Sequence, residues 1–92
     1  MRYMKFTLYT PHCRFEPMEC DSVRFNIADG ADGSFSGSYG IRSGHAKALF
    51  SLSEGKISVS LGGNEVFCAE CSGGFAKVEN NEVTAIVDSV IQ

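Results

Sequence analysis

Four cysteines are the residues best suited to chemistry in this 92-residue chain. Cys68 and Cys71 have the separation typical of zinc and redox sites, and Cys13 and Cys20 could complete a set of four ligands. The residues around Cys68 predict a strand, however, and side chains three apart on a strand point to opposite faces. Three strand steps also separate two Cα atoms by roughly 10 Å, beyond the ~7 Å limit for a disulfide. We therefore expect reduced thiols and no metal.

The remaining reactive side chains do not form a recognisable catalytic pattern. His12 and His45 are the two histidines, and neither comes with an acidic residue and a nucleophile that would make it a general base. Asp29 and Asp32 flank a turn, where aspartate is favoured by bonding to its own backbone, so turn chemistry is preferred over calcium binding. Phosphate-binding, dinucleotide-binding and nucleophile-elbow motifs are absent from the sequence. We predict no enzyme activity, no cofactor and no small-molecule substrate.

The composition indicates one ordinary folded domain. The chain is 43% hydrophobic and 21% charged, which is far from the composition of disordered proteins. Eight basic and eleven acidic residues are dispersed and give a net charge of −3, which argues against nucleic-acid binding. The N-terminal residues lack an apolar segment of signal-peptide or membrane-spanning length. We expect a cytoplasmic protein that is not itself inserted in a membrane.

The positioning elements should be short strands, because apolar residues recur with a period of two and no helical period is present. The fold class predicted is all-β, a two-sheet antiparallel β-sandwich or flattened barrel of about 8–10 short strands. Alternation places strands at residues 3–10, 14–18, 22–28, 46–52, 56–61 and 65–70, with a hairpin after them. The expected core contains Phe6, Leu8, Val23, Phe25, Ile57, Val59 and Val83.

Three segments between these strands carry turn signals. Gly62-Gly63 and Asn80-Asn81 predict two-residue hairpin turns. Residues 29–44 are rich in glycine and serine, with Phe35, Tyr39 and Ile41 as large apolar residues. We predict a packed loop there, without a continuous strand.

The final hairpin has an unusually detailed pattern. Small residues enter it at Ser72-Gly73-Gly74-Phe75, and an alternating strand after the turn ends at Asp88. With the segments before it, this pattern resembles the N-terminal β-sandwich domain of the epsilon subunit of F-type ATP synthases, called delta in mitochondria. The other matching segments are Thr10-Pro11, Asp32-Gly33-Ser34-Phe35, Gly44-His45-Ala46, Glu54-Gly55-Lys56-Ile57 and Val83-Thr84.

The chain departs from the family pattern in two internal places and at its end. Residues 36–39 are interpreted as an insertion, and Ser43 and Lys47 replace the prolines that flank the glycine-histidine-alanine element. Residues 1–88 would be the epsilon-type β-sandwich domain. Residues 89–92 would be a short tail, with the family's C-terminal helical hairpin absent.

The resemblance implies a non-catalytic rotor subunit of the central stalk. Such a subunit links the gamma subunit to the c-ring and supports coupling of ion translocation to ATP synthesis, at the cytoplasmic face of the membrane. It implies that a c-ring-facing loop contains Asp32, Gly33, Ser34, Gly44 and His45, and that Ser72, Gly73, Gly74 and Phe75 are structural. The alternative is a free-standing β-sandwich module that binds a protein or a carbohydrate, although carbohydrate modules usually expose tryptophan and this chain has none.

Overall fold

The computed structural model describes residues 3–29 and 34–91, which form ten strands. In chain order the strands are β1 (Met4–Tyr9), β2 (Met18–Cys20), β3 (Ser22–Asp29), β4 (Ser34–Arg42), β5 (Ala48–Leu52), β6 (Gly55–Leu61), β7 (Asn64–Cys71), β8 (Gly74–Glu79), β9 (Glu82–Val87) and β10 (Val90–Ile91). Within these described ranges no helix has the length and apolar character needed to cross a membrane.

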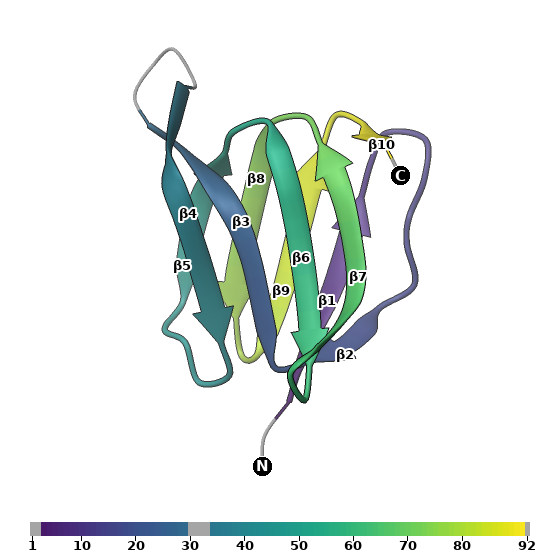
Figure 1. Ribbon diagram of the computed structural model, residues 1–92, viewed down its shortest axis with the longest axis vertical. Coiled ribbons are helices and arrows are strands. Elements are labelled where there is room, and N and C mark those ends of the chain that lie inside the picture. Colours follow the sequence, from purple (N-terminus) through teal and green to yellow (C-terminus); the bar gives the residue numbers. More distant parts are fainter. Residues whose placement is uncertain (1–2, 30–33, 92) are drawn as a thin grey trace.

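The strands form one continuous sheet that folds into two layers (Figure 1). One layer contains β4, β3, β6, β7 and β10, and the other contains β5, β8, β9, β1 and β2. The layers are joined at β3, which pairs with β6 around Val23 and with β5 at Ile27. The predicted all-β sandwich is therefore confirmed.

One strand pair differs from the antiparallel arrangement that we predicted. β1 lies between β2 and β9 and runs parallel to β9, with Phe6 opposite Val83 and Leu8 opposite Ala85. Short turns force antiparallel pairing only between strands that they join. β1 and β9 lie at opposite ends of the sequence, so no turn dictates their direction.

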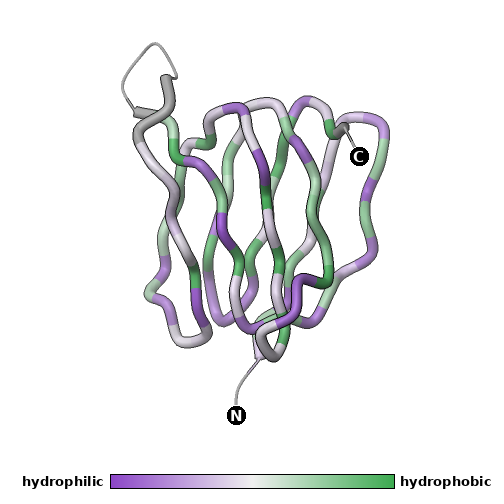
Figure 2. The backbone as a smooth tube through the Cα atoms, viewed as in Figure 1, coloured by the Kyte–Doolittle hydropathy of each residue, from purple (hydrophilic) through white to green (hydrophobic). Residues whose placement is uncertain are grey.

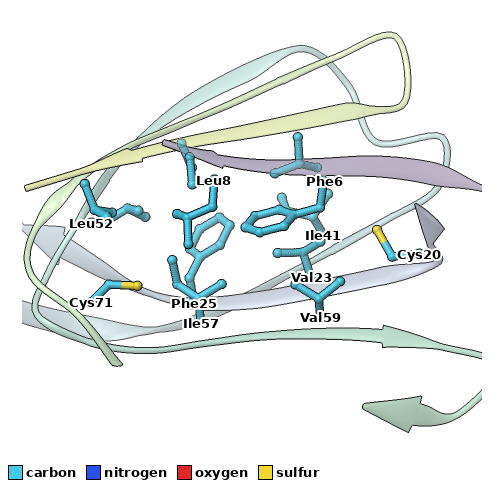
Figure 3. Close-up of a cluster of buried hydrophobic side chains, with 14 of the residues drawn as sticks. Phe6, Leu8, Cys20, Val23, Phe25, Ile41, Leu52, Ile57, Val59 and Cys71 are labelled. Atoms are coloured by element: carbon cyan, nitrogen blue, oxygen red, sulfur yellow. The ribbon is translucent and has the colours of Figure 1, made fainter. Parts of the chain in front are cut away.

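The core between the layers contains every residue that alternation predicted for it. Phe6, Leu8, Val23 and Val83 are fully buried, and Phe25, Ile57 and Val59 are at most 2% exposed. Figure 3 shows side chains from the two layers pointing toward one another, and Figure 2 shows polar residues alternating with apolar ones along the strands. Burying each large apolar side chain stabilises the fold by about 1.5–3 kcal/mol.

Both predicted two-residue turns are confirmed. Gly62 and Gly63 have φ values of 62° and 85°, and Asn80 and Asn81 have φ values of 51° and 60°. Positive φ at both central positions is the geometry of a type I′ turn, which matches the twist of the strands on either side. Glycine and asparagine are the residues that adopt it at least cost.

The prediction of a loop for residues 29–44 is wrong. Most of this segment forms β4, which pairs with β3 from Ser22 opposite Arg42 to Asp29 opposite Ser34. Tertiary pairing overrides the low strand propensity of glycine and serine here, because β3 supplies a long template and Ile41 is buried in the core. Residues 36–39, interpreted as a loop insertion, are therefore part of a paired strand.

The predicted strand at residues 14–18 is also displaced. The observed strand is Met18–Cys20, and Arg14 makes only an isolated bridge with Tyr9. Pro17 lacks the N–H that a paired strand would need, so the chain stays irregular until it has passed this residue. Phe15 still packs inward, with its ring centroid 5.5 Å from that of Phe67.

Candidate functional site

The cysteines do not come together in the described part of the chain. Cys68 is exposed and Cys71 is buried, so the two side chains lie on opposite faces of β7 as predicted. Cys13 is exposed and Cys20 is buried. Burial, followed by a neighbouring carboxylate (Asp21 or Glu70), raises the pKa of the Cys20 and Cys71 thiols to about 11. These two thiols are therefore neutral at physiological pH and chemically quiet.

The residues predicted to face the c-ring do not form one loop. Asp32 and Gly33 lie outside the described residues, while Ser34 begins β4 and Gly44 and His45 follow its last residue, Arg42. At 3.3 Å per residue β4 spans about 26 Å, so Ser34 and His45 lie at opposite ends of the sandwich. The sequence could not reveal this separation, because it arises from the unexpected strand between them.

His45 is half-buried at the edge of the domain, against Tyr39 and Phe50. Its Nε2 atom lies 2.9 Å from the hydroxyl of Tyr39, and its Nδ1 atom lies 2.6 Å from the carbonyl oxygen of Ala46. The ring also makes an edge contact with Phe50, at a centroid distance of 6.2 Å. Both ring nitrogens are thus paired with protein atoms, and the ring also lines an open hollow together with Gly44, Lys47 and the turn residues Asn80 and Asn81.

The chain on either side of His45 is held to the turn between β8 and β9. The Gly44 amide donates to the side-chain oxygen of Asn81 at 2.8 Å. Lys47 forms an ion pair with Glu79 at 3.3 Å, and Lys77 forms another with the same carboxylate at 3.3 Å. The pKa of Glu79 is lowered, first by the hydrogen bond from Lys77 and then by that from Lys47.

The small residues of the Ser72-Gly73-Gly74 element allow close approach of the backbone. A Cβ atom on Gly74 would collide with the Ile86 carbonyl oxygen and lie 2.8 Å from the Cα of Val87, and one on Gly73 would lie 3.0 Å from the Leu52 oxygen. The Ser72 hydroxyl accepts a hydrogen bond from the Ser89 amide at 2.8 Å. These three residues therefore let the end of β9 lie close to β8 and let Gly73 lie close to β5.

Phe75, the fourth residue of that element, instead faces outward. It is 55% exposed, because Ala76 and Val78 take the inward positions of β8. Its partner across the strand pair is Ile86, also 55% exposed, and the next partner is the half-buried Tyr9. Phe75 is therefore not part of the core, and its structural role in the family motif stays a prediction.

A row of apolar side chains thus crosses the outer face of β5, β8, β9 and β1. We call Leu49, Phe75, Ile86 and Tyr9 the apolar row; Leu49 is 70% exposed and lies diagonally across from Phe75. A shallow apolar hollow beside Leu49 is lined also by Lys47, Ala48 and Lys77. This row was not predicted from the sequence, although its signal is visible there: Leu49, Phe75 and Ile86 occupy the outward positions of their strands, which are usually polar.

Comparison with known proteins shows the family of this chain. The family model described as the β-sandwich domain of the ATP synthase delta/epsilon chain matches residues 3–92. The ATP synthase epsilon chain of Chlorobium limicola is 34% identical over 86 residues, covering 94% of this chain and 90% of the relative. The chain belongs to the ATP synthase delta/epsilon family.

Longer epsilon chains match over a smaller share of their length. The epsilon chain of Cyanothece sp. strain PCC 7425 is 46% identical over 56 residues, which cover 61% of this chain and 40% of the relative. The epsilon chain of a Synechococcus strain is 45% identical over 53 residues, 58% of this chain and 38% of the relative. The matched region is thus about two fifths of these cyanobacterial proteins.

Solved structures show the same fold. A cryo-EM structure of the Euglena gracilis mitochondrial ATP synthase contains a chain that superposes with a TM-score of 0.81 at 20% identity, covering 97% of this chain and 52% of that one. A Tetrahymena thermophila mitochondrial ATP synthase structure, of the central stalk and c-ring, gives a TM-score of 0.75 at 17% identity, covering 99% of this chain and 67% of that one. At these identities the likeness demonstrates the epsilon-type sandwich alone.

Proposed function

We propose that this chain is a non-catalytic central-stalk subunit of an F-type ATP synthase. It would link the gamma subunit to the c-ring and support the coupling of ion translocation to ATP synthesis, as a peripheral component at the cytoplasmic face of the membrane. The observation that carries the proposal is the family match, which extends over residues 3–92 of a domain with the epsilon-type fold. The 90% coverage of the Chlorobium limicola epsilon chain supports it.

The sandwich has the mechanical character that a rotor part requires. Its two layers share a core that includes Phe6, Phe25 and Val83, and one hydrogen-bonded sheet passes through both layers. Interiors packed in this way have low compressibility and transmit strain. Such a body can therefore transmit torque from one end to the other.

The apolar row is the surface that we assign to the gamma subunit. Leu49, Phe75 and Ile86 are large apolar side chains exposed together on one face, and Tyr9 extends the row. Contiguous exposed apolar residues on a small domain mark protein contacts, because covering them recovers free energy that water otherwise costs. Aromatic residues such as Phe75 are also among those that contribute most to protein interfaces.

The c-ring would meet an end of the sandwich. The resemblance gives a ring-facing role to Asp32, Gly33 and Ser34 and to Gly44 and His45, but Ser34 and His45 lie at opposite ends of β4. We assign the role to the end that begins β4. This choice is favoured by the hydrogen bonds of His45, whose two ring nitrogens are paired with Tyr39 and Ala46.

The experiment that tests the function is capture of the gamma subunit from the same organism by the full chain. We expect a complex at tens of micromolar for the unmodified protein. Replacing Phe75 and Ile86 together with serine should weaken capture by at least tenfold, since each loses about 1.5–3 kcal/mol of apolar burial. Val66→Ser is the matched control, because Val66 is 49% exposed but lies on β7 in the other layer.

The outcomes separate the rotor function from the alternative. Failure of the unmodified chain to bind the gamma subunit would remove the stalk assignment and favour a free-standing binding module. Binding that is weakened equally by Val66→Ser and by the double substitution would keep the function and reject the apolar row as the contact surface.

A further inference from the structure

One side of the sandwich is closed by aromatic side chains where strand pairing is incomplete. Among the described strands β4 pairs with β3 alone, and the backbone of β5 pairs with the first layer only at Leu52, opposite Ile27. Three rings fill the space between them: the centroid of Phe50 lies 5.6 Å from that of Phe25 and 4.8 Å from that of Tyr39. His45 is the fourth ring, 5.8 Å from Tyr39.

The hydrogen bonds of His45 define which ring nitrogen carries the proton. The Ala46 carbonyl oxygen can only accept, so Nδ1, 2.6 Å away, must be the donor. In a neutral imidazole Nε2 then has a free lone pair, which accepts the Tyr39 hydroxyl proton at 2.9 Å. The two contacts are mutually consistent for the neutral Nδ1–H tautomer, and each one favours the other.

We propose that the Ala46 carbonyl holds His45 as the Nδ1–H tautomer and that Tyr39 is a positioning residue, whose hydroxyl donates to Nε2 and thereby locks residues 43–47 in place. The imidazole packs at the edge between β4 and β5, against the rings of Tyr39 and Phe50.

The lock has a second, independent anchor on the opposite layer. Asn81 accepts the Gly44 amide proton through its side chain, and its backbone oxygen accepts the Lys5 amide proton at 3.0 Å. Asn81 therefore ties the segment to β1 as well as to the turn that it occupies. With Tyr39 on one side of His45 and Asn81 beside Gly44, the segment is held from both layers of the sandwich.

The direct test is NMR of the full chain with 15N-labelled histidine, at a pH where the imidazole is neutral. We expect a pyrrole-type 15N shift at Nδ1 and a pyridine-type shift at Nε2 of His45. Tyr39→Phe removes only the hydroxyl, so Nδ1 should stay protonated, because the Ala46 carbonyl still accepts its proton, while the Nε2 signal should move further toward the value of a free pyridine-type nitrogen. Loss of one hydrogen bond of about 1 kcal/mol should also raise amide exchange at residues 43–46 by about fivefold. Tyr3→Phe, the same change at a tyrosine that is 44% exposed, is the matched control.

The contrary results are equally specific. A protonated Nε2 in the unmodified chain, or an Nε2 shift and amide exchange at residues 43–46 that are both unchanged in Tyr39→Phe, would overturn the lock.

Discussion

The two outer faces of the sandwich differ far more than its two inner faces do. The face formed by β5, β8, β9 and β1 carries the apolar row of Leu49, Phe75, Ile86 and Tyr9. On β6 and β7, Ser58 donates to Glu65 at 2.6 Å and Lys56 lies 3.8 Å from the same carboxylate. Both layers bury apolar residues inward, as the fold requires. Only the outward positions are free to contact a partner, and the gamma contact that we propose lies on the apolar face.

Removing a core side chain should have the largest effect on the free energy of unfolding, because both layers pack against the same core. Phe25→Ala should destabilise the domain by about 3–5 kcal/mol, since the residue is 1% exposed and its ring packs against Phe50 and Tyr39. Urea unfolding followed by circular dichroism measures this directly. A change below about 1 kcal/mol would contradict the core assignment.

Adding a side chain at Gly74, where two backbone segments lie very close together beside the apolar face, should have the next largest effect on stability. Gly74→Ala places a methyl group against the backbone of Ile86 and Val87, which are not free to move as a flexible side chain would be. We expect a loss of about 2–3 kcal/mol in the same unfolding measurement. Ser51→Ala, an outward change on the neighbouring strand β5, is the control and should be nearly neutral. Equal stability of the two variants would show that Gly74 is not required for packing.

Changing the apolar row should affect binding without affecting folding. Phe75→Ser and Ile86→Ser each remove a side chain that is 55% exposed, so we expect unfolding free energies within about 1 kcal/mol of the parent protein. Solubility should rise, because the exposed apolar area falls. Sedimentation at high protein concentration checks this expectation. A large loss of stability would mean that the row contributes to the fold.

The smallest effect concerns the reactivity of the four thiols, two of which are buried inside the sandwich and two of which are exposed. Cys13 and Cys68 should react with a thiol reagent in the native protein, whereas Cys20 and Cys71 should react only after unfolding. Burial raises the pKa of the latter two to about 11, so raising the pH from 7 to 9 leaves them protonated. Mass spectrometry of the modified protein counts the reacted sites. Four fast-reacting thiols would show that the interior is open.

The interior was predictable from the sequence because strict alternation leaves few choices for residues such as Phe6 and Val59. β4 was not, because its glycines and serines have low strand propensity and its pairing depends on β3 and on burial of Ile41. The orientation of His45 was equally hidden, since it depends on Tyr39, which only the fold brings within 2.9 Å. The apolar row was predictable as well, because its strands carry large apolar residues at outward positions in addition to the inward ones.

The most direct test of the account is an NMR titration of the isotopically labelled chain with the gamma subunit from the same organism. We predict that the backbone amides of Leu49, Phe75 and Ile86 shift or broaden, while those of Arg24 and Ser58 on the opposite face stay unchanged. Perturbation centred on Arg24 and Ser58, or no perturbation at tens of micromolar gamma subunit, would contradict the assignment of the apolar face to the stalk.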